Sequence, residues 1–189
     1  MPTAFASEPA PLMFEIQPFD SATYRQQTRR STVIVAVIFV AMAMLLSSLA
    51  VMLFGTPGGD NFRWNAGGVA LAVMLCAALF KVKLWSQPWM SAAVYGWRLK
   101  RALMSVTNVM HDVEAGVKAQ LPEAMKLLRF YHQGLTQMYL LEADTSSLSQ
   151  VTAEINAHKD AMQTLGLETD QPRLNPQWLL ALNGLAKAK

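Results

Sequence analysis

The chain has 189 residues, of which 52% are hydrophobic and only 15% are charged. Soluble domains average about 25% charged residues, so the composition argues against an ordinary soluble protein. The formal net charge of +3 is small. The basic residues lie mainly beside apolar segments, which favours anionic lipid headgroups over nucleic acid as their neighbours. Cys76 is the only cysteine, which excludes a disulfide within one chain.

Residues 1–20 are expected to form a disordered or juxtamembrane N-terminus. Residues 1–11 are rich in Pro, Ala and Ser, a composition typical of disorder. Phe14, Ile16 and Phe19 then alternate with polar residues. This alternation fits either a short extended segment or a contact with the membrane interface, and the sequence leaves both alternatives open.

Thr32 to Phe54 form the first apolar segment, a long run without a charged side chain. As a helix it reaches roughly 35 Å, which exceeds a bilayer hydrocarbon core of about 30 Å. A cleavable signal peptide is the competing interpretation, because Ser48, Leu49 and Ala50 resemble a cleavage site. The run is longer than the roughly 7–15 apolar residues of a signal core, so we expect a membrane span at residues 32–54.

The second apolar segment covers residues 64–84 and predicts a second span. Its apolar part reaches about 25 Å as a helix. Lys81 and Lys83 at its end have stems long enough to return to the headgroups. A short loop with adjacent glycines separates it from the first segment. The sequence therefore predicts a transmembrane hairpin over residues 21–86.

Small side chains recur along both predicted spans at helical spacing and let two backbones approach closely. They can pack the spans against each other or mediate dimerisation, and the spacing fits both. Neither span has an ionisable residue in its interior, which argues against a transporter or pump. The residues predicted to pack within the membrane are Ala43, Ser47, Gly68, Ala72 and Cys76.

Arginine, lysine and tryptophan residues at the span ends are predicted to anchor the chain at the membrane interface. Eight Lys and Arg residues flank the outer ends of the hairpin, whereas Arg63 alone lies in its loop. This bias predicts both termini in the cytoplasm and the loop in the periplasm. The predicted anchors are Arg25, Arg29, Arg30, Trp64, Lys81, Lys83, Trp85 and Trp89.

Residues 87–189 are predicted to form a cytosolic helical domain. Pro88 is well placed to start a helix, and apolar residues follow at alternating spacings of about four and three, typical of coiled-coil-like packing. The segment breaks at Leu121-Pro122 and again at residues 144–147, giving three helices and hence an antiparallel three-helix bundle. The predicted bundle core comprises Leu99, Leu103, Val106, Met110, Leu128, Tyr131, Leu135, Val151, Ile155 and Met162.

The ends of the third predicted helix carry recognisable signals. Ser147 and Gln150 match a capping box at its start, and Gly166 followed by Leu167 matches a left-handed cap at its end. A last short helix begins at Asn175-Pro176. All predicted elements are therefore helical, and the fold class is an all-α membrane protein.

Histidines next to carboxylates are the main candidates for chemistry. His158 follows Glu154 by four residues and could offer two metal ligands from one helix face, but no further ligand is evident. His111-Asp112 and Tyr131-His132 fit acid–base catalysis, yet no nucleophile motif or phosphate-binding loop accompanies them. We therefore expect hydrogen-bonded structural histidines, no catalysis, no metal or other cofactor and no small-molecule substrate.

Several stretches resemble one known family. They include Phe14-Glu15-Ile16, Asn61-Phe62-Arg63-Trp64-Asn65, Val94-Tyr95-Gly96-Trp97-Arg98, and Arg129-Phe130-Tyr131 with Gln133-Gly134-Leu135. The chain is similar over most of its length to uncharacterised two-span inner-membrane proteins of gammaproteobacteria, known as a domain of unknown function (family 3087). It departs from their pattern at residues 141–147. The resemblance implies an inner-membrane protein and assigns no activity or functional residues.

Two functions fit these patterns. The first is a non-enzymatic membrane-anchored interaction or scaffold protein whose cytosolic bundle self-associates or docks another membrane or cytosolic protein. The alternative is a small oligomeric channel or an accessory subunit of a membrane transport complex. The lipid bilayer is the one partner common to both.

Overall fold

The computed structural model describes residues 14–186, with side chains up to residue 182. The described residues form helices without a strand, in two compact units. One unit, which we call the hairpin, comprises residues 22–95. The other, which we call the helical unit, comprises residues 96–186 together with residues 14–21. The disorder expected for residues 1–11 concerns residues outside this range. The unit boundary falls after Tyr95 and not at residue 87, where the sequence placed it.

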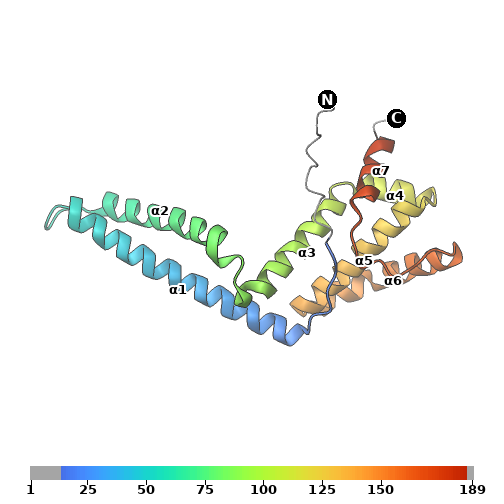
Figure 1. Cartoon of the computed structure of the whole chain (residues 1–189), viewed down its shortest axis with the longest axis horizontal. Coiled ribbons are helices and arrows are strands. Elements are labelled where there is room, and N and C mark those ends of the chain that lie inside the picture. The colour runs from blue at the N-terminus through green and yellow to red at the C-terminus, as the bar shows by residue number, and fades with distance from the viewer. Residues whose placement is uncertain (1–13, 187–189) are drawn as a thin grey trace, which may run out of the picture. The chain divides into compact units, whose positions relative to one another are not determined.

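Residues 22–95 contain two helices that are long and apolar enough to cross a membrane. Helix α1 covers Ser21–Phe54, and α2 covers Phe62–Leu79 and continues as a π-helical turn, η1, at Phe80–Leu84. Figure 1 shows α1 and α2 side by side, joined by a tight turn. The helix that contains the first predicted span thus starts eleven residues before Thr32, and no break separates its arginines from its apolar part.

The two helices of this hairpin pack through their small residues. A β-carbon on Gly68 would lie 2.5 Å from Cα of Ser47, so the backbones meet at this point. Ser47 Oγ also donates a 2.7 Å hydrogen bond to Oδ1 of Asn65. Ala72 is fully buried, and Cys76 Sγ lies 3.5 Å from Met42 Sδ. Of the two uses left open for these small residues, the structure uses them to pack α1 against α2, with Ala43 half-buried.

Polar side chains close the turn between α1 and α2. Asn61 Oδ1 accepts a hydrogen bond from the amide of Thr56, and Asn61 Nδ2 donates one to the carbonyl of Thr56. Asp60 accepts from the amide of Phe62 at the start of α2. The rings of Phe54 and Trp64 stack with centroids 5.1 Å apart. The turn therefore satisfies backbone groups that neither helix can bond internally.

The short 3₁₀ turn η2, Pro88–Met90, belongs to the hairpin and does not open the helical unit. Ser31 of α1 is 2% exposed, and its Oγ lies 2.6 Å from the carbonyl oxygen of Trp89 and 2.8 Å from that of Gln27. This contact ties the chain after the second helix back to α1. The predicted boundary at residue 87 was too early because Pro88 starts a turn that is hydrogen-bonded to α1 of the hairpin.

The remaining helices are α3 (Ser91–Thr107), α4 (Met110–Lys118), α5 (Pro122–Glu142), α6 (Thr145–Thr164) and α7 (Pro176–Ala186). The sequence predicted one helix from Pro88 through Val117, and this prediction was wrong. The helix breaks at Asn108 and Val109, where the amide of Val109 bonds the carbonyl three residues before it. The break turns α4 so that it packs against both α5 and α7.

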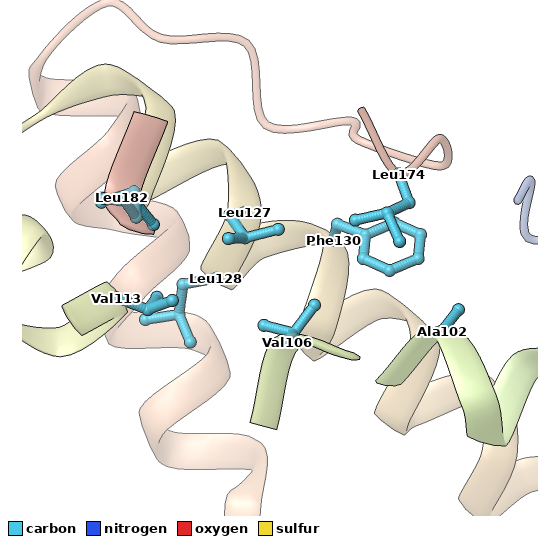
Figure 2. Close-up of a cluster of buried hydrophobic side chains, with 9 residues drawn as sticks. Ala102, Val106, Val113, Leu127, Leu128, Phe130, Leu174 and Leu182 are labelled. Carbon is cyan, nitrogen blue, oxygen red and sulfur yellow. The ribbon is translucent and has the colours of Figure 1, made fainter. Parts of the chain in front are cut away.

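Helix α5 lies at the centre of the helical unit and is buried on several faces. It contacts α4, α6 and α7, and a β-carbon on Gly134 would meet Leu103 of α3 at 2.8 Å. Figure 2 shows side chains of α3, α4, α5 and α7 and of the segment before α7 meeting in one cluster. The cluster consists of Ala102, Val106, Val113, Ala124, Leu127, Leu128, Phe130, Leu174 and Leu182.

The predicted core residues divide into two groups. Leu99, Leu103, Val106, Leu128 and Met162 are buried. Met110, Tyr131, Leu135, Val151 and Ile155 are only partly buried. Phe130 and Leu127 are fully buried but were not predicted as core residues, because the prediction assumed a single apolar stripe on each helix. A single stripe describes a helix with one packed face, whereas α5 has neighbours on several faces.

Residues 14–17 form an extended segment that packs onto the helical unit. The amide of Ile16 bonds the carbonyl of Pro172, and the amide of Leu174 bonds the carbonyl of Phe14. The ring of Phe14 meets Phe130 edge to face at a centroid distance of 6.4 Å. Of the two alternatives left open for this segment, the structure shows the extended one. The expected separate N-terminal region is therefore corrected for residues 14–20, which belong to the same unit as residues 96–186.

The helix caps follow the predictions in one case and differ in another. Gly166 has a φ of +67°, and the amide of Leu167 bonds the carbonyl of Met162, which confirms the left-handed cap. The cap of α6, however, is Asp144 and not Ser147. Asp144 accepts hydrogen bonds from both the amide and the hydroxyl of Ser147, and these bonds lower the pKa of its carboxyl group.

We predict that Gly68→Val separates α1 from α2, because a β-carbon there would overlap the backbone of Ser47. The cost should be at least about 1–3 kcal/mol, the usual penalty of overpacking. Gly67→Val is the matched control, since no atom lies within 4 Å of a β-carbon at Gly67. Thermal unfolding of the detergent-purified protein would measure the difference, and equal stability of the two variants would contradict this packing.

Candidate functional site

Two histidines lie together between α5 and α6 and are the least expected polar feature of the helical unit. His132 of α5 is 3% exposed and His158 of α6 is 8% exposed. Their rings meet edge to face with centroids 5.2 Å apart. Buried histidines are uncommon unless their nitrogens have partners, so the bonding of each ring nitrogen is the main question.

His158 has a well-defined partner. Its Nε2 lies 3.0 Å from the carbonyl oxygen of Met125, and since a carbonyl only accepts, this nitrogen carries the proton and donates it. His158 is therefore a hydrogen-bonded histidine that links α6 to α5, in agreement with the structural role expected for it.

His132 is poorly satisfied. Its Nδ1 is buried and has no hydrogen-bond partner. Its Nε2 lies 3.6 Å from Oε1 of Glu154, which is too long for a hydrogen bond. The neighbouring Tyr131 ring is 6.2 Å away and tilted. The pairing that the sequence suggested, Tyr131 with His132, is thus weaker than the contact of His132 with His158.

Both histidines are held neutral at physiological pH. Burial is the main cause that lowers the pKa of His132 from 6.5 to about 4, and repulsion from His158 and Arg129 adds to it. Burial also lowers the pKa of His158, although the hydrogen bond to Met125 acts in the opposite direction. Arg129 itself is fixed nearby by a 2.7 Å hydrogen bond from Nε to the carbonyl of Thr169.

The arrangement suits packing better than catalysis. A general acid or base needs access to the group whose proton it transfers, and His132 is covered on all sides. Among residues 14–182, no three or more His, Cys, Asp or Glu side chains lie close enough to hold a metal ion. We therefore interpret the pair as a polar contact between α5 and α6.

The contact between the two histidines could have been found from the sequence by one further step. If α5 and α6 form a hairpin that turns at Ala143 and Asp144, residues at equal distances from the turn face each other. This places His132 opposite Ile155, which is within one helical turn of both Glu154 and His158. The pair is not evident when each histidine is compared only with its neighbours along the chain.

The predicted interface anchors lie at the two ends of the hairpin. Trp64 is at the turn, while Lys81 and Lys83 are exposed in η1 at the opposite end. Trp85 packs edge to face on Phe80 with centroids 5.6 Å apart. Trp89, half-buried, follows in η2, and Arg25, Arg29 and Arg30 lie exposed on the first turns of α1.

Fold and sequence together define an all-helical protein with two helices long and apolar enough to span a membrane. The family model described as "Protein of unknown function (DUF3087)" matches residues 14–179, so the chain belongs to this family. No curated protein and no solved structure shows significant similarity to this chain. The matched range includes the hairpin and the helical unit up to the first residues of α7.

We predict that acidification weakens the contact between α5 and α6. The folded pKa of His132 lies below its unfolded value of 6.5, so its contribution to stability is intact above pH 6.5 and is lost as the pH falls towards 4. Between pH 7 and pH 5 the loss should be about 2 kcal/mol. Urea unfolding of the detergent-purified protein at pH 7 and pH 5, followed by circular dichroism, would measure it.

His132→Leu should reduce this pH dependence, because leucine has a similar size and does not bind a proton. His111→Leu is the control, since His111 is an exposed histidine of α4. If both variants keep the pH dependence of the unchanged protein, the loss of stability arises from other groups and the interpretation of His132 is wrong.

Proposed function

We propose that this protein is a non-enzymatic membrane-anchored interaction protein, in which the hairpin spans the bacterial inner membrane and the helical unit docks a partner or a second copy on the cytoplasmic side. The supporting observation is the contrast between the two units. Most of the large exposed hydrophobic side chains lie in residues 33–82, on α1, α2 and η1. The helical unit has its own apolar cluster around α5.

A bilayer would cover the exposed apolar surface of the hairpin. The best window of α1 has a mean hydropathy of 2.7 and no buried residue, and that of Phe62–Leu84 has a mean hydropathy of 1.9 with 11% buried. A core helix of a soluble protein would be mostly buried, whereas these helices expose Val37, Met44 and Met74 by more than 60%. Such a surface is unstable in water and favourable in lipid.

The packing of residues 14–17 supports a location of both ends on one side of the membrane. These residues precede α1, and the segment that they pair with, Pro172 to Leu174, follows the hairpin. A direct backbone hydrogen bond requires the two segments to share one compartment. The bias in Lys and Arg, a separate observation, favours the cytoplasm for that compartment.

One exposed face of α3 has the composition of an interaction surface. Trp97 is 48% exposed and Met104 is 64% exposed, and they lie seven residues apart on one side of the helix. Arg101 lies between them, with its guanidinium 5.2 Å from the Trp97 ring centroid. Trp, Met and Arg are enriched at protein interfaces. We call Trp97, Arg101 and Met104 the α3 face and expect the partner to cover it.

Topology is the first test. Reporter fusions after Gly59 should report the periplasm, and fusions after Lys189 should report the cytoplasm, because the basic residues flank the outer ends of the hairpin. Paired periplasmic and cytoplasmic reporters at both positions would measure this. A cytoplasmic signal from the Gly59 fusion would contradict the proposed orientation.

Assembly is the second test. The protein extracted from membranes in mild detergent should carry a second copy or a stoichiometric partner, measured by multi-angle light scattering together with mass spectrometry. Trp97→Ala with Met104→Ser should release it, whereas His111→Ala with Lys118→Ala, two exposed changes on α4, should not. A bare monomer would overturn the proposal, and a closed ring of four or more copies would favour the channel alternative.

A further inference from the structure

The charges of the hairpin are distributed unevenly. Residues 22–95 contain a single carboxylate, Asp60, which lies in the turn between α1 and α2. Six Lys and Arg residues accompany it. Five of these, namely Arg25, Arg29, Arg30, Lys81 and Lys83, lie towards the other end, where Ser31 contacts Trp89. That end of the hairpin therefore carries most of the positive charge of residues 22–95.

An open groove on α1 lies within this charged end. It is lined by Arg25, Arg29 and Val33 in one row and by Gln26, Arg30 and Ile34 in the next. Residues four apart follow each other along one helix face, so the two rows run parallel to the helix axis. At 100° per residue, the groove faces away from the side of α1 that carries Ser31, and the contact with Trp89 leaves it uncovered.

The groove changes from polar to apolar along its length. Its first two turns carry arginines and a glutamine, and its last turn carries Val33, which is 56% exposed, and Ile34. Beyond them α1 continues as an uncharged apolar helix. A ligand that fits such a groove has an anionic group at one end and a hydrocarbon chain at the other.

We propose that this groove binds an anionic phospholipid, with the phosphate on Arg29 and Arg30 and an acyl chain along Val33 and Ile34. Guanidinium groups bind phosphate oxygens through paired, charge-assisted hydrogen bonds. Basic residues next to a span also attract the anionic lipids of the cytoplasmic leaflet. The inference rests on the proposed membrane insertion of the hairpin and adds to it a defined headgroup site.

The test uses the full chain, purified in mild detergent and titrated with phosphatidylglycerol, with phosphatidylcholine or with inorganic phosphate, and measured by native mass spectrometry. Phosphatidylglycerol should bind at least about tenfold more tightly than phosphatidylcholine. Arg29→Gln with Arg30→Gln should abolish most of this preference. Arg98→Gln with Lys118→Gln removes two exposed charges outside the hairpin and should leave it unchanged.

The outcomes separate the sources of the phosphate group. A lipid site predicts that inorganic phosphate does not displace phosphatidylglycerol, because phosphate lacks the chain that contacts Val33 and Ile34. Displacement by phosphate at similar concentration would overturn the lipid assignment. Equal preference in the groove variant and in the unchanged protein would overturn the site itself.

Two further observations keep the test decisive. If the double glutamine variant does not fold, Arg29→Lys with Arg30→Lys replaces it. This variant keeps the charge but loses the paired hydrogen bonds, so lipid binding should weaken about threefold or more. An unchanged affinity would overturn the proposal.

Membrane fractionation of the unchanged protein tests insertion separately. A protein absent from the membrane fraction would contradict the proposed function, whereas an inserted protein without lipid preference would contradict only the groove.

Discussion

The exposed apolar surface of α1 and α2 constrains the rest of the hairpin. Backbone amides and carbonyls in a hydrocarbon environment must find partners within the chain, and both segments achieve this as continuous helices. Where the helices end, side chains supply the partners, as Asn61 does for Thr56. Close packing at Gly68 then brings the two helix backbones into contact.

The helical unit follows a different constraint, which is the burial of α5 among its neighbours. A helix with several packed faces has little surface left for polar groups, yet His132 lies in the middle of α5 with one buried nitrogen unpaired. Such a group costs free energy, and at neutral pH this cost is limited because burial keeps the imidazole uncharged. The opposed His158 avoids the same cost through the Met125 carbonyl.

Features that depend on local composition could be predicted from the sequence. The two apolar helices follow from continuous apolar segments, and the left-handed cap at Gly166 requires only a few neighbouring residues. The small residues on both helices could also be identified, although the sequence left open whether they pack the two helices together or mediate dimerisation. The cap of α6 was assigned to Ser147 because both Asp144 and Ser147 are good caps, and only the structure shows which side chain accepts the bond.

Features that depend on residues far apart in the sequence could not be predicted in the same way. No glycine or proline marks the break at Asn108 in the sequence. Beyond the break, α4 packs against α5 and α7, which are distant in the sequence. The burial of Phe130 and the contact between His132 and His158 depend on which helices surround α5. The groove on α1 was anticipated only as separate anchoring arginines, since its shape depends on the two rows of side chains.

The hydrogen bonds between Phe14 and Leu174 and between Ile16 and Pro172 have a consequence for the order of folding. Residues 14–17 are synthesised before both apolar helices but pair with residues 172–174, which follow them in the sequence. Contacts of such large sequence separation form late because closing the loop costs entropy. Phe14 therefore cannot form these hydrogen bonds until residues 172–174 have been synthesised, so this part of the helical unit is completed only after both apolar helices have been made.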